Sequence, residues 1–284
     1  MSDRLVLAAG VTALLALSAG AAAAQDWRTT TIMRQTTNEE SLAVEVGYGA
    51  GRLVVEPAEG RMLYQASLRY DARGFRPIAE YSGGRLRLGI DGNDNLHLPD
   101  DHDEHHGGRM TLRLGPNVPL DLDFEFGAAM AEIELGGLSV RSLDISTGAS
   151  ETRVDFSAPN RVQLDRLNID VGAAQFTARG LGNANVREVQ LHGGVADLTL
   201  DFTGRWRGDT RVDAEFGLGS LTIRVPRDVG VRVHKQTILA SFEAPRMSRR
   251  GDDDFYSDNW SSARRHLTVD LEGAFGDIRI DWVD

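Results

Sequence analysis

The residues best suited to chemistry lie in one short segment, NLHLPDDHDEHHGG, which concentrates histidine and carboxylate side chains. Histidine nitrogens and carboxylate oxygens are ligands for Zn²⁺, and nearby anions raise the affinity of such a site. The candidate metal ligands are His97, His102, His105, His106 and Asp103. Solvated loops have the same composition, so a metal site and a plain surface loop both stay open as interpretations of this segment.

Two further acidic segments have a structural interpretation beside the chemical one. DGNDN matches the opening of a Ca²⁺ loop, but Leu96 and His102 stand where such a loop needs Gly and Glu, so a hairpin turn is the better interpretation. GDDDFYSDNW places Phe255, Tyr256 and Trp260 among aspartates. These rings could contact a ligand or partner, and packing over the end of the fold is the favoured interpretation.

The sequence carries no motif that indicates an enzyme. It has no cysteine, and it lacks G-x-S-x-G, H-E-x-x-H, a P-loop and a dinucleotide fingerprint. Carboxylate pairs such as Asp121 and Asp123 have the chemistry of an acid and a base, but on alternating strands such pairs usually form the solvated face. We therefore expect a non-catalytic protein without a cofactor.

The N-terminus predicts export. Residues 5–24 are uncharged, Arg4 precedes them, and Ala22 and Ala24 have the spacing of a signal-peptide cleavage site. An uncleaved membrane anchor is the alternative, because twenty apolar residues are just long enough to span a bilayer. We expect a location in the periplasm or on the cell surface. The net charge of −11 argues against binding to nucleic acid or to an anionic membrane.

Seven segments repeat one pattern, in which apolar and polar residues alternate on both sides of a small residue. The positions three and five residues before this corner, and six after it, are apolar in every copy. The predicted structural corners are Gly49, Gly127, Gly148, Gly172, Gly194, Gly217 and, two residues after Ala274 in the last copy, Gly276.

The alternation identifies each arm as a strand with one buried face. That face moves from odd to even positions across the corner, which a flat strand cannot do, because a shift of one residue turns every side chain over. We therefore expect a sharp bend where missing side chains permit unusual dihedral angles and close backbone approach. The four central corner intervals are 21, 24, 22 and 23 residues without a helical segment, which favours a β-solenoid over the alternative, an antiparallel β-sandwich.

Stacking in register would align outward residues into two columns. The far column, four residues before each corner, holds Glu45, Asp123, Asp144, Asn168, Gln190, Asp213 and Asp270. The near column, two residues before each corner, holds Gly47, Glu125, Ser146, Asp170, His192, Glu215 and Glu272. A solvated acidic face is the favoured interpretation, and weak binding of divalent cations or of a basic partner is the alternative.

The predicted organisation is a signal peptide at 1–24, a β-rich N-terminal domain at 27–116 that caps the stack, and a repeat domain at 117–284 with a long loop at 244–264. Segment 230–266 as a whole is interpreted as an excursion before the last repeat, which ends at Trp282. Bare strand edges invite aggregation, so a stack of this kind needs a cap.

Several segments also resemble the bacterial toast-rack family: the FG-x-G and VG-A-A corners, LGPNVPLDLDFEFGA, GLGNANVREVQL and GLGSLTIRVPRDVGVRV. The resemblance covers about residues 40–284. It implies an envelope protein with a right-handed single-stranded β-helix, a distinct N-terminal domain and no assigned catalytic residues. The chain is more distantly similar to the extracytoplasmic part of LiaF-like stress regulators, which carry several membrane helices, and to candidate bacterial adhesins.

These observations predict a non-catalytic cell-envelope protein that acts as a scaffold or adhesin-like interaction module. Its expected partner is an envelope protein or a glycan, since stacked repeats create extended binding surfaces. The alternative is a periplasmic protein that binds a small ligand or a divalent metal.

Overall fold

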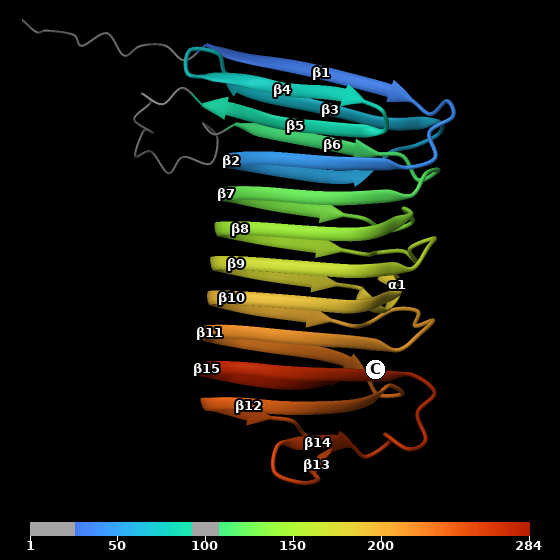
Figure 1. The fold of residues 1–284 in the computed structure, drawn as a ribbon, viewed down its shortest axis with the longest axis vertical. Coiled ribbons are helices and arrows are strands. Elements are labelled where there is room, and N and C mark those ends of the chain that lie inside the picture. Colours follow the sequence, from blue (N-terminus) through green and yellow to red (C-terminus); the bar gives the residue numbers. More distant parts are fainter. Residues whose placement is uncertain (1–25, 93–107) are drawn as a thin grey trace, which may run out of the picture.

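A computed structural model describes residues 26–92 and 108–284. Within these residues the protein is all-β, apart from the single turn of helix α1 (Leu181–Ala184), and its strands form one mixed, mostly parallel sheet. No helix in these residues is long and apolar enough to cross a membrane. Figure 1 shows the strands stacked as an elongated ladder.

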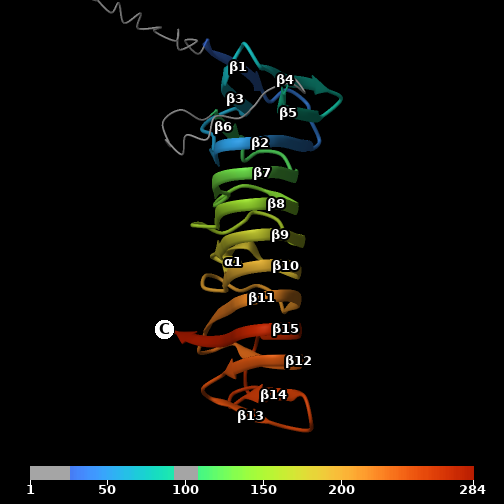
Figure 2. The same cartoon turned by 90° about the vertical axis from the view of Figure 1, so that its left-hand side faces the viewer.

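Long bent strands make up most of the ladder. In spatial order they are β2 (Leu42–Pro57), β7 (Leu120–Glu134), β8 (Val140–Asp155), β9 (Leu164–Arg179), β10 (Val186–Asp201), β11 (Thr210–Pro226), β15 (His266–Val283) and β12 (Gly230–Glu243). Every neighbouring pair in this series is parallel, so the antiparallel sandwich considered above does not hold. Each strand turns back at a corner, and the corners lie together along one edge (Figure 2).

The predicted change of buried face at the corners is confirmed. In β2 the side chains of Val44 and Val46 are buried before Gly49, and those of Leu53 and Val55 are buried after it. The two arms of each strand therefore face each other across a core that includes the fully buried rings of Phe124, Phe156, Phe176 and Phe202. The core follows from the sequence, because most inward positions have an apolar residue, with Thr147 and Thr152 among the buried polar exceptions.

Shorter strands continue the stack beyond β2. The first arm of β2 pairs with β5 (Arg85–Gly92), which pairs with β4 (Phe75–Ser82). The second arm pairs with β6 (Arg109–Leu114), followed by β3 (Met62–Asp71) and β1 (Trp27–Gln35). Since β2 also pairs with β7 along its length, the segment 27–116 and the repeats share one continuous sheet.

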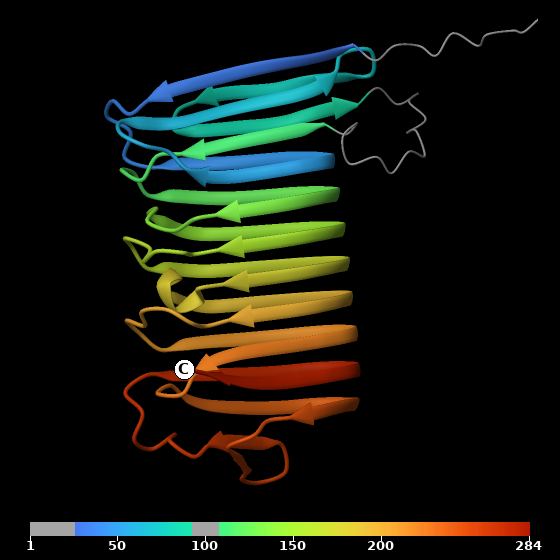
Figure 3. The same ribbon diagram turned by 180° about the vertical axis from the view of Figure 1, so that it is seen from behind.

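The other end of the stack corrects the sequence analysis. Residues 230–243 do not belong to an excursion: they form β12, a bent strand that pairs in parallel with β15. The last strand of the chain, β15, is inserted between β11 and β12 (Figure 3). The repeat pattern missed β12 because Lys235 stands opposite the inward Leu271, and because Ile238 stands at the corner position, where the other bent strands have a small residue.

The segment after β12 contains the short strands β13 (Met247–Arg249) and β14 (Asp254–Ser257). They form an antiparallel hairpin, and β14 pairs with β12. The hairpin thus covers part of the outer edge of the last bent strand.

Candidate functional site

The corner edge is built on a column of glycines. A Cβ atom placed on Gly127 would lie 2.7 Å from the carbonyl oxygen of Gly49, and one on Gly194 would lie 2.8 Å from that of Gly172. The same holds for Gly148, Gly172 and Gly217, at 2.9–3.0 Å from the preceding glycine oxygen. A Cβ atom at any of these five positions would press on the backbone of the preceding strand, so these corners have the predicted close backbone approach.

The unusual dihedral angles lie two residues further on. Gly51, Gly219 and Gly276 have φ angles of 124°, 137° and 142°, which residues with a side chain rarely adopt. Gly49 and Gly217, at the corners before the first two of these, do not have a positive φ. Close backbone approach therefore explains the small residue at the corner, and an unusual dihedral angle explains the glycine two residues later.

An open groove of about 1280 Å³ follows the glycine column from β4 and β5 to β12. It exists because the corner glycines carry no side chain while the near column stands beside them. Every near-column residue lines it, together with the corner glycines from Gly49 to Gly217, Ile78, Ile90, Asp91 and Gln236. The groove therefore presents a similar cross-section at each successive strand.

The near column gives the groove an acidic wall. Glu215 of β11 lies directly opposite Glu272 of β15, and both side chains are exposed. Within the described part of the chain neither carboxylate forms an ion pair with an arginine or lysine. At mid-stack the Nδ1 atom of His192 lies 3.0 Å from Oδ1 of Asp170. The wall thus keeps unpaired negative charge beside β11 and β15, where a cationic group could be bound.

The far column is better compensated than the near column. Arg211 contacts both Asp213, at 3.1 Å, and Asp270, at 2.7 Å, and the side-chain amide of Asn168 donates a hydrogen bond to Asp144.

The negative charge of the far column is less well compensated where two of its carboxylates are neighbours and no side-chain amide lies between them. Partial desolvation of the carboxyl and the negative charges of Asp144 and Glu45 raise the pKa of Asp123, although the residue is exposed at the surface. In the carboxylate pair Asp121 and Asp123, considered above as an acid and a base, Asp121 is bound by Arg141 and Ser142.

A serine, an aspartate and a histidine adjoin in the groove, but their order is wrong for nucleophilic catalysis. Ser146 on β8 faces Asp170 on β9, which in turn faces His192 on β10. A catalytic triad needs the imidazole between the other two groups so that it can take the serine proton. Here the carboxylate stands between them, so this row polarises no nucleophile.

The metal prediction concerns residues that the structure does not describe. His97, His102, His105, His106 and Asp103 all fall within 93–107, so the site stays a prediction. Among the residues described, no group of three or more histidine, aspartate or glutamate side chains is arranged to hold a metal ion. The DGNDN segment also runs beyond the described residues after Gly92.

The aromatic residues of the acidic segment 251–260 pack on one another and on β12. The Phe255 ring lies 4.7 Å from that of Phe242, and the Tyr256 and Trp260 rings are 5.4 Å apart. Asp254 is bound by Arg232, with a distance of 2.9 Å between Nη2 and Oδ1. These contacts fit the structural interpretation of the segment as a cover for the end of the stack.

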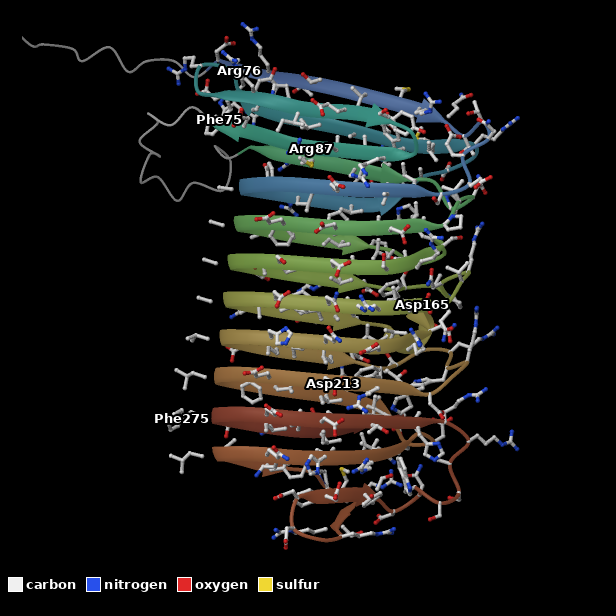
Figure 4. The ribbon with its side chains drawn as sticks, in the orientation of Figure 1. Phe75, Arg76, Arg87, Asp165, Asp213 and Phe275 are labelled. Carbon is white, nitrogen blue, oxygen red and sulfur yellow. The ribbon has the colours of Figure 1, made fainter. Side chains whose placement is uncertain are left out.

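A second feature of this edge was not predicted from the sequence: a row of apolar residues lies one position after each corner. We call it the corner ridge, and its members are Ala50, Ala128, Ala149, Ala173, Val195, Leu218, Phe275 and Leu239. All of them are exposed, and Phe275 projects from the edge in Figure 4. Aligning the repeats at this position would have found the row, because it is apolar in every copy although it faces solvent.

This arrangement defines a class of protein: an all-β stack of parallel bent strands with a solvent-facing glycine edge. Residues 22–179 and 160–224 match the family described as the N-terminal domain of toast_rack, DUF2154. The chain belongs to the toast_rack family, as its corner and link motifs suggested. No curated protein matches its sequence.

Two solved structures are similar to the chain at low sequence identity. A putative cell adhesion protein from Clostridium sporogenes is 15% identical, with a TM-score of 0.45, over 90% of this chain and 100% of that one. A putative adhesin from Bacteroides fragilis is 10% identical, with a TM-score of 0.41, over 88% and 97% of the two chains. These relationships leave the function to be argued from the corner edge itself.

Proposed function

We propose that the chain is an exported, non-catalytic cell-envelope protein that binds an extended partner along its corner edge. The observation that carries this proposal is the continuous groove, which crosses the bent strands from β2 to β12. A groove whose lining repeats at each strand suits a partner whose own structure repeats or extends, such as a polypeptide segment or a glycan chain.

We further propose that the bent strands form a single-stranded β-helix, in which each strand and its return loop make one coil. Parallel pairing in register and the gathering of all corners on one edge support this fold (Figure 2). Its right-handedness is an expectation from the toast-rack resemblance. A rigid stack of this kind would hold the groove straight without help from the partner.

The proposed location follows from the apolar run at residues 5–24, which has the layout of a secretory signal. We place the protein in the periplasm or on the cell surface, either free or held by an uncleaved N-terminal segment. In either place, the acidic near column is exposed to water, where salt screens its attraction for the partner. Binding of the partner should therefore weaken as salt is added.

The proposal can be tested by co-sedimentation of the purified chain with envelope fractions. A tryptophan in place of Ser146 or His192 would obstruct the groove without disturbing the core, because both side chains are exposed. We expect these variants to lose most of the sedimented fraction. Thr199→Trp, on the outer face of the second arm of β10 and outside the groove, is the matched control and should sediment like the unaltered chain. Equal sedimentation of all three variants would contradict the proposal.

A further inference from the structure

Four large apolar side chains form a continuous exposed strip at one end of the corner ridge. Val195 is opposite Leu218, and Phe275 lies between Leu218 and Leu239 in the register of the sheet. Their exposed fractions are 56%, 51%, 49% and 67% in the order Val195, Leu218, Phe275, Leu239. Among the described residues, Met33 is the other large apolar side chain exposed to this degree. Contiguous exposed apolar residues are characteristic of a docking site. We call these four residues the apolar strip.

The surroundings of the apolar strip are acidic. Within three residues on either side of each of its four members there is no lysine or arginine, whereas Glu215, Glu272, Asp197 and Asp277 all fall within these windows. The two glutamates belong to the near column on one side. On the other side, Asp197 accepts a hydrogen bond of 2.9 Å from Ser220, and Asp277 accepts one from Ser241. The strip is thus an apolar line between two pairs of carboxylates.

We propose that the apolar strip binds a basic amphipathic α-helix of a partner protein, laid along the axis of the stack. This inference rests on the proposed function, since it names the kind of partner that the corner edge takes. The helix would place its apolar face on Val195, Leu218, Phe275 and Leu239. Its arginine or lysine side chains would reach Glu215 and Glu272 on one side and Asp197 and Asp277 on the other.

The spacing of the strip matches a helix better than a strand. Neighbouring strands of a sheet are ~4.8 Å apart, so the four side chains span ~14 Å. Helix positions i, i+3, i+7 and i+10 span ~15 Å at 1.5 Å per residue, which brings about one side chain to each strand of the stack. In an extended peptide, side chains on one face recur every ~6.6 Å and would lose register within two strands.

Charge also decides between partners. A second copy of the chain would bring the same four carboxylates against Glu215, Glu272, Asp197 and Asp277, and like charges in such contacts are unfavourable. An anionic membrane surface would be repelled for the same reason. A basic helix gains from both features of the site, the apolar strip and the carboxylates beside it.

The test is a titration of the purified chain with a fluorescent, helix-stabilised peptide that carries leucine at i, i+3, i+7 and i+10 and arginine on both flanks. We expect saturable binding that weakens at least about tenfold for the double variant Leu218→Thr with Phe275→Thr, since central apolar anchors dominate such contacts. The pair Glu215→Gln with Glu272→Gln should weaken binding several-fold and reduce its dependence on salt. Met33→Thr removes an equally exposed apolar side chain from β1 and should leave binding unchanged.

Several outcomes would overturn the inference. One is equal affinity for a peptide in which glutamate replaces arginine, and another is unchanged binding by the Leu218→Thr and Phe275→Thr variant. Binding of the chain to phosphatidylglycerol vesicles that is lost in this variant would assign the strip to a membrane. Dimerisation in sedimentation velocity that is lost in the variant would assign the strip to a second copy of the chain. If the groove variants still lose envelope binding while no peptide binds, the inference fails and the proposed function stands.

Discussion

Gly127 lies so close to Gly49 on the preceding strand that a methyl group on it would be 2.7 Å from the Gly49 carbonyl oxygen. Gly49 itself has nothing within 4 Å of the equivalent position, because no bent strand lies above it. One residue type thus fills the same corner position for different reasons. From β7 to β11 a side chain at this position would meet the backbone of the preceding strand, and at Gly49 it would not.

The first prediction uses this contrast. Gly127→Ala and Gly194→Ala should each lower the free energy of unfolding by about 1–3 kcal/mol, because the added Cβ meets a backbone oxygen that cannot move alone. Gly49→Ala, whose φ is not in the left-handed region, should be neutral or stabilise by up to about 1 kcal/mol through the unfolded state. Chemical denaturation of the three variants measures this. Equal effects at all three positions would show that the column does not set the strand spacing.

The bend, and the change of buried face across it, could be predicted from the sequence because every second residue of a strand with one buried face is usually apolar. Val46 and Val55 are both apolar and both buried, yet they are nine positions apart, an odd offset that no flat strand permits. Strand β12 escaped the same analysis because Lys235 interrupts its inward positions. The insertion of β15 between β11 and β12 is a long-range pairing, and no local pattern encodes it.

The candidate site was only half visible in the sequence. Its acidic wall was expected from the near column, and the register of Glu215 with Glu272 confirms that alignment. The corner ridge was not expected, because Ala50 and Ala128 look like ordinary small corner residues until Leu218 and Phe275 are placed in the same row. The role of this row depends on whether its side chains are exposed, and that is known only from the folded structure.

A second prediction concerns pH. Because the folded state raises the pKa of Asp123, its ionisation costs stability, and this cost grows as the pH rises through the carboxyl range. Asp123→Asn should therefore stabilise the chain by about 0.5 kcal/mol at pH 7, as expected for relief of like charges on paired strands. The gain should vanish well below pH ~3.9, where the carboxyl is protonated in both states. Thermal melts of the two chains from pH 3 to pH 7 provide the measurement, and a gain that grows toward low pH would contradict the account.

A third prediction concerns Asn160, which joins the loops opposite the corners. Its side chain is fully buried, accepts the backbone N–H of Val140 at 2.8 Å, and donates to the carbonyl oxygens of Val140, Val162 and Ala184. Asn160→Ala leaves these groups without partners and should destabilise by about 2–3 kcal/mol.

The exposed Asn117 provides the control for this change. It donates one hydrogen bond, to Gly60, so Asn117→Ala should cost less than about 0.5 kcal/mol. Urea denaturation separates the two cases. A small effect at Asn160 would mean that water replaces its hydrogen bonds, and the loops would then not be tied together by this side chain.

A fourth prediction concerns Arg211, which compensates the far column between β11 and β15. Arg211→Gln leaves Asp213 and Asp270 facing each other without their shared cation. Because these side chains are partly exposed, the loss should be modest, about 0.5–1 kcal/mol at low salt, and it should shrink as salt screens the repulsion. Melting curves in low and high NaCl measure it, and a loss independent of salt would point to packing instead of charge.

The central claim, that the corner edge is the binding surface, is tested most directly by photo-crosslinking in cells that export the chain. A photoreactive phenylalanine analogue at Ser146 or His192 would stand in the groove, and one at Arg153 would stand on the exposed outer face of the second arm of β8. We predict that Ser146 and His192 crosslink to the same envelope component and that Arg153 does not. Crosslinking of that component from Arg153 with equal yield, or from Arg153 alone, would contradict the account.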